Sequence, residues 1–336
     1  MSSLRIVHCA NFSESKNGAV YYAIDRKLSN GLIRNGHFVY DFSYREIAKN
    51  SNIFKSKKFG IKKVNENLIE VIKNIKPHLL LLGHSELISH ESLEKIKAIL
   101  PDIKIAMWWV DPFDKIEHIY KRLEIVDVFF ATTGISKLRE IFGNVSAKLL
   151  FFPNPCDKSI ENIKSYEKKE YEFDLIYIGR NDNRRKDFID KLKDLKDLKI
   201  ALFGNSKDNL IYGAKYYDTI SNSKIALNFS RYNDIDMYSS DRIIQLTSNG
   251  ILTMSPRIPK YELLFSENEV VYFDSYNDFK EKLYFYLEND NKRREIAKNG
   301  YLKAHESFNS TRVSKYMLES IFEPNISQKY EWEIGH

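Results

Sequence analysis

The chain has 336 residues, of which 43% are hydrophobic and 29% charged, with 13 glycines and 8 prolines. This composition excludes collagen-like, mucin-like and disordered proteins, and the length corresponds to about two domains. The formal net charge of +6 suits an anionic small molecule or membrane surface, but it is too modest and too dispersed to predict nucleic-acid binding.

Short apolar runs alternate with amphipathic helical stretches through the first half of the chain. The expected strands are 4–9, 38–44, 79–82, 103–110, 126–131 and 149–152, and the expected helices are 18–35, 64–75, 89–100 and 135–142. Strands that are apolar on both faces are typical of a parallel sheet covered by helices. We therefore expect this half to be a doubly wound α/β domain.

The pattern stops at Pro153-Asn154-Pro155 and restarts at Phe173, and the charged residues 156–172 between them favour a linker. The second half predicts strands at 173–178, 199–203, 225–229, 251–254 and 270–273, helices at 184–195 and 241–248, and three helical stretches from 276 to about 322. The predicted fold is α/β, with two doubly wound, Rossmann-like domains that face a cleft. The predicted domains are 1–160 and 161–308, followed by a C-terminal helix and tail at 309–336.

The cysteines and the N-terminal residues predict the compartment. Cys9 and Cys156 lie outside any metal-binding spacing, so neither a disulfide framework nor a zinc site is expected. The N-terminus lacks the pattern of a signal peptide, and no apolar run approaches the roughly 20 residues that cross a bilayer. We expect a cytoplasmic protein.

Ligands of open parallel sheets bind beyond the carboxyl ends of the strands, so the loops that follow the strands are the expected site. No GxGxxG follows the first strand, and neither GxxxxGK[ST] nor GxSxG occurs. These absences argue against dehydrogenases, P-loop enzymes and α/β-hydrolases.

A basic loop follows the first strand of the second half. Arg180, Arg184, Arg185 and Lys186 lie beside a strand-to-helix turn, where side-chain charge and the free N–H groups of a helix start combine into a site for a diphosphate. The alternative interpretation is a solvated basic face of a helix.

A second polar stretch includes Asn228 and Ser230 at a strand end and Asp241 and Arg242 at a helix start. Ser240 or Asp241 is expected to cap this helix, with Arg242 in its first turn. A nucleotide could bind there. The alternative is an ordinary capped helix in which Arg242 forms an ion pair.

From about residue 173 to 322 the sequence resembles the C-terminal half of GT-B glycosyltransferases of the CgeB-like, group 1 type. The similar segments are IGR…RRKDF at 178–188, SKIALNFSR at 223–231, SSDRIIQLTSNGILTMS at 239–255, the stretches 259–265 and 269–274, and YLENDNKRREIAKNGYLKAHESF at 286–308. The N-terminal half is a weaker match.

The resemblance implies that a sugar is transferred from a nucleotide-sugar donor, held mainly by the C-terminal half, to an acceptor on the N-terminal half. It assigns Arg180 and Lys186 to the donor diphosphate, gives Arg184 and Arg185 the place of the family's basic pair, and puts Glu262 near the ribose. It also implies that the last helix crosses back to the first domain.

Gln245 departs from the family pattern, because many relatives have glutamate at this position. Glutamine can hydrogen-bond to sugar or ribose hydroxyls but carries no charge. The departure leaves the donor nucleotide, UDP or GDP, open.

For a general base the candidates are Asp111, His84 and Glu14, each in a loop after or near an N-terminal strand end. Asp111 ranks first because the strand that contains Trp108 and Trp109 directs it outward and Pro112 fixes the turn. The alternative is that Asp111 caps the next segment and that His84 is a packed or capping residue.

Gly18 and Trp109 are the expected acceptor-side residues. Gly18 would open a helix and let a ligand approach its start. Trp109 would stack on a sugar, although a core position is the commoner role for a tryptophan in a strand.

No metal and no cofactor are expected, and the nucleotide sugar is a substrate. The Asp234-Ile235-Asp236 segment matches the DxD motif of metal-dependent transferases of another fold, but it lies in a polar loop without matching elements. Arginines, a lysine and helix N-termini can stabilise the leaving diphosphate without a metal.

The predicted function is a glycosyltransferase that acts in surface polysaccharide or glycoconjugate synthesis. The alternatives are a noncatalytic nucleotide- or sugar-binding protein and a nucleotide-sugar epimerase. The expected partners are the donor and a glycan or lipid-linked acceptor, without nucleic acid and with at most peripheral contact at the inner face of the cell membrane. An apolar stripe on the last helix is expected to be buried against the protein, and it comprises Val313, Tyr316, Met317, Ser320 and Ile321.

Overall fold

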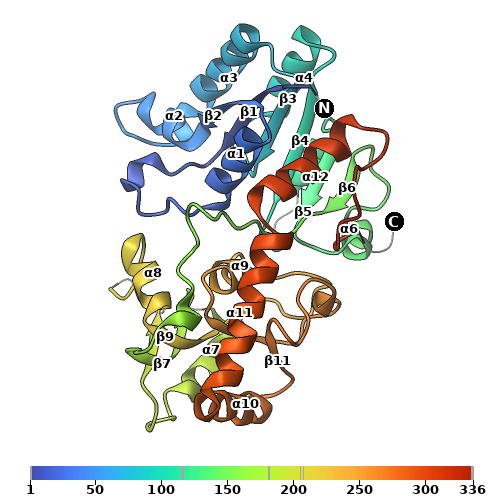
Figure 1. The fold of residues 1–336 in the computed structure, drawn as a ribbon. Coiled ribbons are helices and arrows are strands. Elements are labelled where there is room, and N and C mark those ends of the chain that lie inside the picture. Colours follow the sequence, from blue (N-terminus) through green and yellow to red (C-terminus); the bar gives the residue numbers. More distant parts are fainter. Residues whose placement is uncertain (1, 115–116, 181, 205, 207, 334–336) are drawn as a thin grey trace. The chain divides into compact units, whose positions relative to one another are not determined.

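The computed structural model describes residues 2–114, 117–180, 182–204, 206 and 208–333 (Figure 1). The chain divides into two compact units, one formed by Met1–Pro153 with Ser310–His336 and the other by Asn154–Asn309. Each unit contains a parallel β-sheet flanked by helices. The prediction of two doubly wound α/β domains is confirmed.

The first unit contains a six-stranded parallel sheet with the order β2-β1-β3-β4-β5-β6. Its strands are β1 (Arg5–Ala10), β2 (Phe38–Ser43), β3 (Leu79–Gly83), β4 (Lys104–Trp109), β5 (Val128–Ala131) and β6 (Lys148–Phe151). Its helices are α1 (Ile24–Arg34), α2 (Tyr44–Asn50), α3 (Ile61–Ile75), α4 (His90–Ile99), α5 (Glu117–Leu123), α6 (Ile135–Phe142) and α12 (Ser310–Phe322).

Alternate residues of β3 explain how this sheet is held between two layers of helices. Leu80 and Leu82 belong to a core cluster that also contains Val64 and Leu68 of α3. Leu79 and Leu81, which point to the opposite face because side chains alternate along a strand, are equally buried. Burial on both faces is the reason why β3 is a continuous apolar run.

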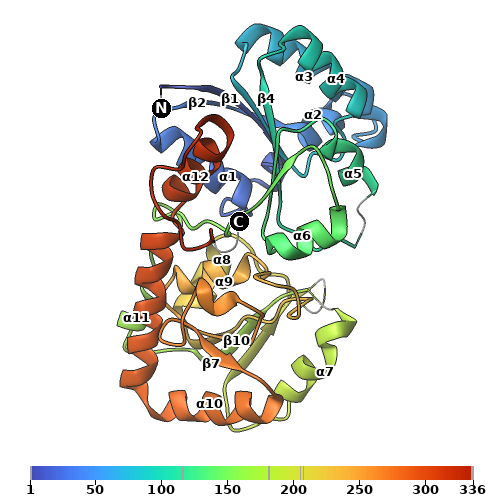
Figure 2. The same cartoon turned by 90° about the vertical axis from the view of Figure 1, so that its right-hand side faces the viewer.

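The second unit contains a five-stranded parallel sheet with the order β11-β10-β9-β7-β8. Two of its strands, β7 and β10, are labelled in Figure 2. Its strands are β7 (Phe173–Ile178), β8 (Ile200–Phe203), β9 (Ser223–Leu227), β10 (Leu252–Pro256) and β11 (Val271–Phe273). The helices α7 (Asn183–Leu192), α10 (Tyr276–Glu288) and α11 (Asp290–Ser307) share one core cluster with the sheet. The helices α8 (Ala214–Ser221) and α9 (Arg242–Thr247) contact β9 and β10.

Both sheets have a topological switch point beside their first strand. In the first unit β1 lies between β2 and β3, and in the second β7 lies between β8 and β9. Successive crossovers leave in opposite directions at such a strand, which opens a crevice at its carboxyl end. The loops after β1, β3, β7 and β9 are therefore the places where each unit can bind a ligand.

The predicted linker over residues 156–172 is wrong, because this segment packs into the second unit. The backbone N–H of Cys156 donates to the carbonyl of Phe308 at 2.8 Å. Asp157 and Glu161 are fully buried, and the Glu161 carboxylate accepts the backbone N–H of Asp157 at 2.8 Å. The boundary consequently lies at 153, and not at the predicted residue 160.

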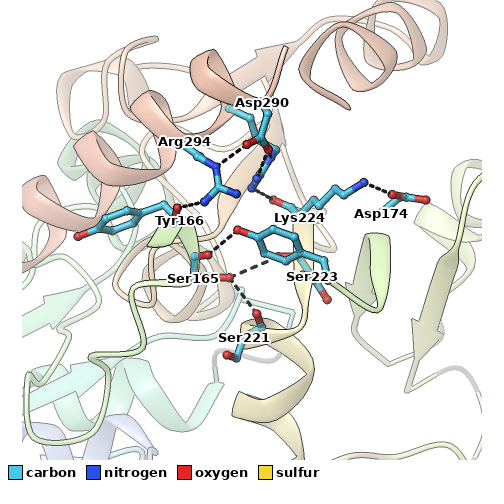
Figure 3. Close-up of polar contacts among 10 residues, drawn as sticks. Ser165, Tyr166, Asp174, Ser221, Ser223, Lys224, Asp290 and Arg294 are labelled. Atoms are coloured by element: carbon cyan, nitrogen blue, oxygen red, sulfur yellow. Dashed lines mark hydrogen bonds and ion pairs between the residues drawn. The ribbon is translucent and has the colours of Figure 1, made fainter. Parts of the chain in front are cut away.

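Figure 3 shows hydrogen bonds that join the segment 156–172 to α8, β9 and α11. The hydroxyl of Ser165 lies 3.2 to 3.4 Å from three carbonyl oxygens, those of Ile220, Ser221 and Ser223. Arg294 of α11 donates to the carbonyl of Tyr166. These contacts satisfy polar groups that a linker would leave to water.

Several other element predictions need correction. The helix expected over 18–35 begins only at Ile24, because Asn17 and Gly18 both have positive φ angles, of 51° and 81°, that a right-handed helix does not contain. The helices α2, α5 and α8 were not predicted. Among the described residues, no helix is long and apolar enough to span a membrane.

The last helix, α12, packs closely against α1 within the first unit. Val313, Tyr316, Met317 and Ser320 of the expected stripe are buried. A Cβ atom on Gly31 of α1 would lie 2.1 Å from the carbonyl oxygen of Ser310. The two helices can approach this closely only because position 31 has no side chain.

We predict that Gly31→Ala destabilises the first unit. Alanine favours a helix interior by about 1 kcal/mol over glycine, but here its methyl group would push on backbone. The expected fall in the free energy of unfolding is about 1 to 3 kcal/mol, as for an overpacked core, and urea denaturation measures it. Ile33→Ala on the exposed face of α1 is the control, with an expected change of about 0.5 kcal/mol or less. An unchanged or raised stability of Gly31→Ala would contradict the close packing.

Candidate functional site

The centre of the candidate site in the second unit is Arg185, in the first turn of α7. The side chain is buried and donates from Nη1 to the carbonyl of Phe229 at 3.2 Å and from Nη2 to the carbonyl of Arg180. Burial lowers the pKa of Arg185, and the charge of Arg242 acts in the same direction. Its Nε has no hydrogen-bond partner among the described residues.

Arg242, in the first turn of α9, completes an arginine pair with Arg185. Its Nε donates to the carbonyl of Ile178 at 2.6 Å, and its Nη1 donates to the same Phe229 carbonyl at 3.2 Å. The two guanidinium groups lie 5.8 and 5.1 Å from the centroid of the Tyr177 ring.

The hydrogen-bond acceptors of this arginine pair are all neutral groups among the described residues. In the part of the chain that the structure describes, no carboxylate forms an ion pair with Arg185 or Arg242, so the ion-pair alternative for Arg242 does not apply. Two cations that share one carbonyl oxygen repel each other, and an anion that bridges them would relieve this repulsion with charge-assisted hydrogen bonds.

Two glycines let the backbone approach Arg242. A Cβ atom on Gly179 would lie 2.5 Å from the Tyr177 hydroxyl oxygen and 2.7 Å from Nη2 of Arg242. Gly204 has a φ of +88°, and its Cβ would lie 2.6 Å from the carbonyl oxygen of Gly179. Sequence analysis did not assign a role to Gly179 or Tyr177, although a glycine directly after a strand was a usable signal.

The other cations of the basic loop are more exposed. Arg180 and Lys186 are exposed, and Arg184 stacks on the ring of Tyr232 at 4.3 Å. Asp182 caps α7 by accepting the backbone N–H of Arg184 at 3.0 Å. The loop thus brings the four predicted cations to one helix start, with Arg185 buried and the others at the surface; Asn181 lies outside the described residues.

Asn228 and Ser230 hold the loop between β9 and α9. Both are fully buried. The Asn228 amide donates to the hydroxyls of Ser239 and Ser255 at 3.1 and 3.0 Å, and the Ser230 hydroxyl accepts the backbone N–H of Ser240 at 3.0 Å. These bonds fix the loop that carries Arg242.

The donor-binding roles of Asp241, Gln245 and Glu262 stay predictions, and the structure shows which contacts these side chains already make. Asp241 does not cap α9 with its side chain; it accepts the amide N–H of Gln245 instead. The amide oxygen of Gln245 accepts the hydroxyl of Tyr216, so both ends of this side chain are engaged within the unit. Glu262 is exposed on the 3₁₀ turn Tyr261–Leu263, and within the described residues no hydrogen bond or ion pair joins it to the arginine pair.

In the first unit, His84 and Asp111 lie together at the ends of β3 and β4. Nδ1 of His84 is 3.8 Å from Oδ2 of Asp111, and the His84 and Asp111 side chains are 19% and 69% exposed. The His84 ring stacks on Trp109 with 4.0 Å between centroids and an interplanar angle of 22°. The carboxylate of Asp111 is thus open to solvent beside a packed imidazole.

The turn that carries His84 is strained and firmly held. His84 and Ser85 have φ angles of +56° and +47°, a region that costs a non-glycine residue about 1 kcal/mol or more. Arg122 is buried and donates to the carbonyls of His84 and Ile88 at 2.7 and 2.8 Å. Tertiary hydrogen bonds therefore fix the backbone turn that carries the imidazole.

The local structure at Trp109 and Gly18 differs from the expectation, and whether either residue contacts an acceptor stays a prediction. Trp109 is buried, and its ring packs on His84 and Phe113, as expected for a core position and not for a sugar platform. Gly18 does not open a helix. It lines, with Glu14 and other residues of the loop after β1, a pocket of about 280 Å³ in the first unit.

Two buried groups in the first unit escaped sequence analysis. His8 accepts the indole N–H of Trp108 at 3.1 Å and contacts the hydroxyl of Ser29 at 2.8 Å, and burial lowers its pKa to about 3. Burial raises the pKa of Asp25 to about 7, although its carboxylate accepts the backbone N–H of Asn11 at 3.0 Å. The position of His8 inside an apolar strand was the only sequence signal for its burial, and no sequence signal indicated the burial of Asp25.

The chain was compared with known families and structures. Residues 184–319 match the family model described as Glycosyl transferase-like. No curated protein matches the chain.

Solved structures share the fold over nearly the whole chain. Sucrose-phosphate synthase from Thermosynechococcus elongatus aligns with a TM-score of 0.64 and 11% identity, covering 94% of this chain and 98% of the other. HepE from Anabaena in complex with UDP-glucose aligns with a TM-score of 0.62 and 10% identity over 94% and 99% of the chains. A glycosyltransferase from Rickettsia africae aligns with a TM-score of 0.61 and 11% identity over 97% and 100%. These similarities establish the GT-B type of fold.

We predict that the arginines of the second unit bind a nucleoside diphosphate. Arg180→Ala and Arg185→Lys should each weaken binding of UDP or GDP by about 1.5 to 3 kcal/mol, the range for hydrogen bonds to charged groups. Isothermal titration calorimetry measures the affinity, and thermal unfolding without nucleotide shows whether the variant is folded.

The matched control for this prediction is Arg257→Ala. Arg257 is a surface arginine of the same unit that forms ion pairs with Glu267 and Asp274 at 2.9 and 3.1 Å. Its loss removes one positive charge from the unit, as Arg180→Ala does, but should leave the affinity unchanged. If all three variants bound UDP or GDP as tightly as the unaltered protein does, the basic loop would not belong to the nucleotide-binding site.

Proposed function

We propose that the protein is a glycosyltransferase of the CgeB-like group that transfers a sugar from a nucleotide sugar to a hydroxyl of a glycan or lipid-linked acceptor. The observation that carries this proposal is the arginine pair, Arg185 and Arg242, at the switch point of a glycosyltransferase-like region. We place its action in surface polysaccharide or glycoconjugate synthesis, in the cytoplasm at the inner face of the cell membrane.

In this proposal the arginine pair binds the donor diphosphate. The leaving nucleoside diphosphate gains negative charge as the glycosidic bond breaks, and fixed cations stabilise that charge without reorganisation. The nucleotides named with similar structures, UDP and UDP-glucose in HepE, support a diphosphate ligand. Gln245 and Asp241 then act on the donor indirectly, through the position of α9.

Asp111 is the proposed general base. Its exposed carboxylate accepts the proton of the acceptor hydroxyl as that oxygen attacks the anomeric carbon, and His84 positions it from 3.8 Å.

We predict that Asp111→Asn lowers kcat by about 100-fold or more, because loss of a general base typically costs 10² to 10⁴. Initial rates of donor consumption with saturating acceptor measure the effect. Asp102→Asn, at an exposed aspartate in the turn before β4, is the control and should keep the full rate. A rate for Asp111→Asn equal to that of the control would exclude Asp111 as the base.

Transfer should not require a metal. Asp236 of the DxD segment forms an ion pair with Lys260, and the described residues contain no group of three or more His, Cys, Asp and Glu side chains that could hold a metal ion. We predict that activity survives dialysis against EDTA. Activity that vanishes and returns with manganese or magnesium would make Asp234 and Asp236 ligands.

The experiment that tests the function is a panel of nucleotide sugars incubated with the protein and analysed by mass spectrometry. Transfer to an added acceptor supports the proposal. Conversion of free donor to an isomer without acceptor would indicate an epimerase, and tight nucleotide binding without turnover would indicate a binding protein.

A further inference from the structure

An exposed apolar cluster projects from the first unit between α2 and α3. It lies in residues 51–63, called here the Phe54–Phe59 loop. Ile53 is 90% exposed, Phe54 72% and Phe59 67%. The two phenylalanine rings pack on each other with 5.7 Å between centroids, so they form one patch and not scattered side chains. Contiguous exposed apolar groups mark interaction surfaces in folded proteins.

The loop is ordered by its own hydrogen bonds. The Asn52 amide group donates to the carbonyls of Ala48 and Ser56 at 2.9 and 2.8 Å, and its oxygen accepts the backbone N–H of Ser56 at 3.0 Å. At the other end Gly60 is buried, and a Cβ there would lie 1.9 Å from the carbonyl oxygen of Ala48. The apolar side chains are therefore presented by a fixed scaffold.

Lysines surround this apolar cluster. Residues 51–63 contain no aspartate or glutamate and five exposed lysines, Lys55, Lys57, Lys58, Lys62 and Lys63. Of these, Lys62 and Lys63 both lie within 4.0 Å of the Glu66 carboxylate, so one acid serves two cations. The loop carries a local positive charge much denser than that of the chain as a whole.

We propose that the Phe54–Phe59 loop docks the protein on an anionic phospholipid bilayer. Ile53, Phe54 and Phe59 would enter the region between headgroups and acyl chains while the lysines contact lipid phosphates, the arrangement of apolar tip and basic rim by which proteins bind membrane surfaces. This inference rests on the membrane location in the proposed function and names the surface that would bind the lipid. Vesicle binding needs neither donor nor acceptor, so it can fail while sugar transfer is intact, and the reverse.

The charge pattern favours a lipid surface over a protein partner. Lysine is depleted in protein–protein interfaces, whereas it supplies all the charged residues of this segment. A bilayer also suits the chemistry of the cluster better than a nucleic acid does. The most exposed side chain of the cluster, Ile53, is aliphatic and cannot stack on a nucleic-acid base.

Vesicle co-sedimentation of the full chain tests the proposal. The protein should bind vesicles of phosphatidylcholine with about 30 mol % phosphatidylglycerol and bind pure phosphatidylcholine far less, because each lysine near an anionic surface strengthens binding about fivefold. Phe54→Ser with Phe59→Ser should weaken the partition coefficient at least about tenfold. Lys55→Gln, Lys57→Gln and Lys58→Gln together should weaken it about 100-fold.

Matched controls separate local docking from general charge or hydrophobicity. Lys169, Lys196 and Lys298 are exposed lysines of the second unit, and their triple glutamine variant removes the same charge. Phe285→Ser removes an aromatic residue that is 49% exposed. Both controls should bind as the unaltered chain does. Equal losses in the controls and in the loop variants would overturn the proposal.

A fluorescent reporter makes the test independent of sedimentation. Trp108, Trp109 and Trp332 are buried, so a tryptophan placed by Phe54→Trp would be the exposed emitter. Its emission should shift to the blue with the anionic vesicles and stay unchanged with phosphatidylcholine. The absence of a shift would overturn the proposal. Self-association without vesicle binding, if it disappears in the Phe54→Ser, Phe59→Ser variant, would instead assign the patch to a second copy of the chain.

Discussion

Burial of both faces of a parallel sheet is the constraint on which each unit depends. Strands such as β3 are apolar on every residue because helices cover the sheet from both sides, which leaves no room for ligand-binding groups within the strands. Polar groups accumulate where the strands stop. His84 follows β3 and Arg180 follows β7, so the topology alone brings them to the carboxyl edges of their sheets.

At the carboxyl edge of the second sheet, two arginines are held by neutral hydrogen-bond acceptors and not by carboxylates. Arg185 and Arg242 donate to carbonyl oxygens, whose partial charges stabilise a guanidinium less than a carboxylate would. A structural ion pair would remove the affinity for an anion, since a bound phosphate would compete with the resident acid. The use of backbone acceptors and of the Tyr177 ring fixes both arginines and keeps their charge available.

The fold was more predictable than the contacts of the site. The strand 173–178, buried at its three central residues, was predicted to the residue, because a mainly apolar run bounded by polar turns needs no information from elsewhere in the chain. The helix α2 spans Tyr44–Asn50, too short for a helical period to be recognised. The linker at 156–172 was wrongly predicted because composition does not distinguish a solvated carboxylate from a buried one. The buried Glu161 carboxylate accepts a hydrogen bond from the backbone N–H of Asp157. Gln245 was expected to contact ligand, but its partner Tyr216 comes from a helix that sequence periodicity did not reveal.

The two units differ in the backbone geometry that positions their candidate site residues. In the second unit, glycine at 179 lets neighbouring backbone and side chains approach each other. In the first, non-glycine residues His84 and Ser85 accept left-handed backbone angles, and the cost of about 1 to 3 kcal/mol for each is offset by hydrogen bonds from Arg122. A glycine at position 84 would relieve the strain but remove the imidazole that lies beside Asp111. The left-handed turn thus holds the His84 imidazole beside Asp111, at a backbone cost that the hydrogen bonds from Arg122 offset.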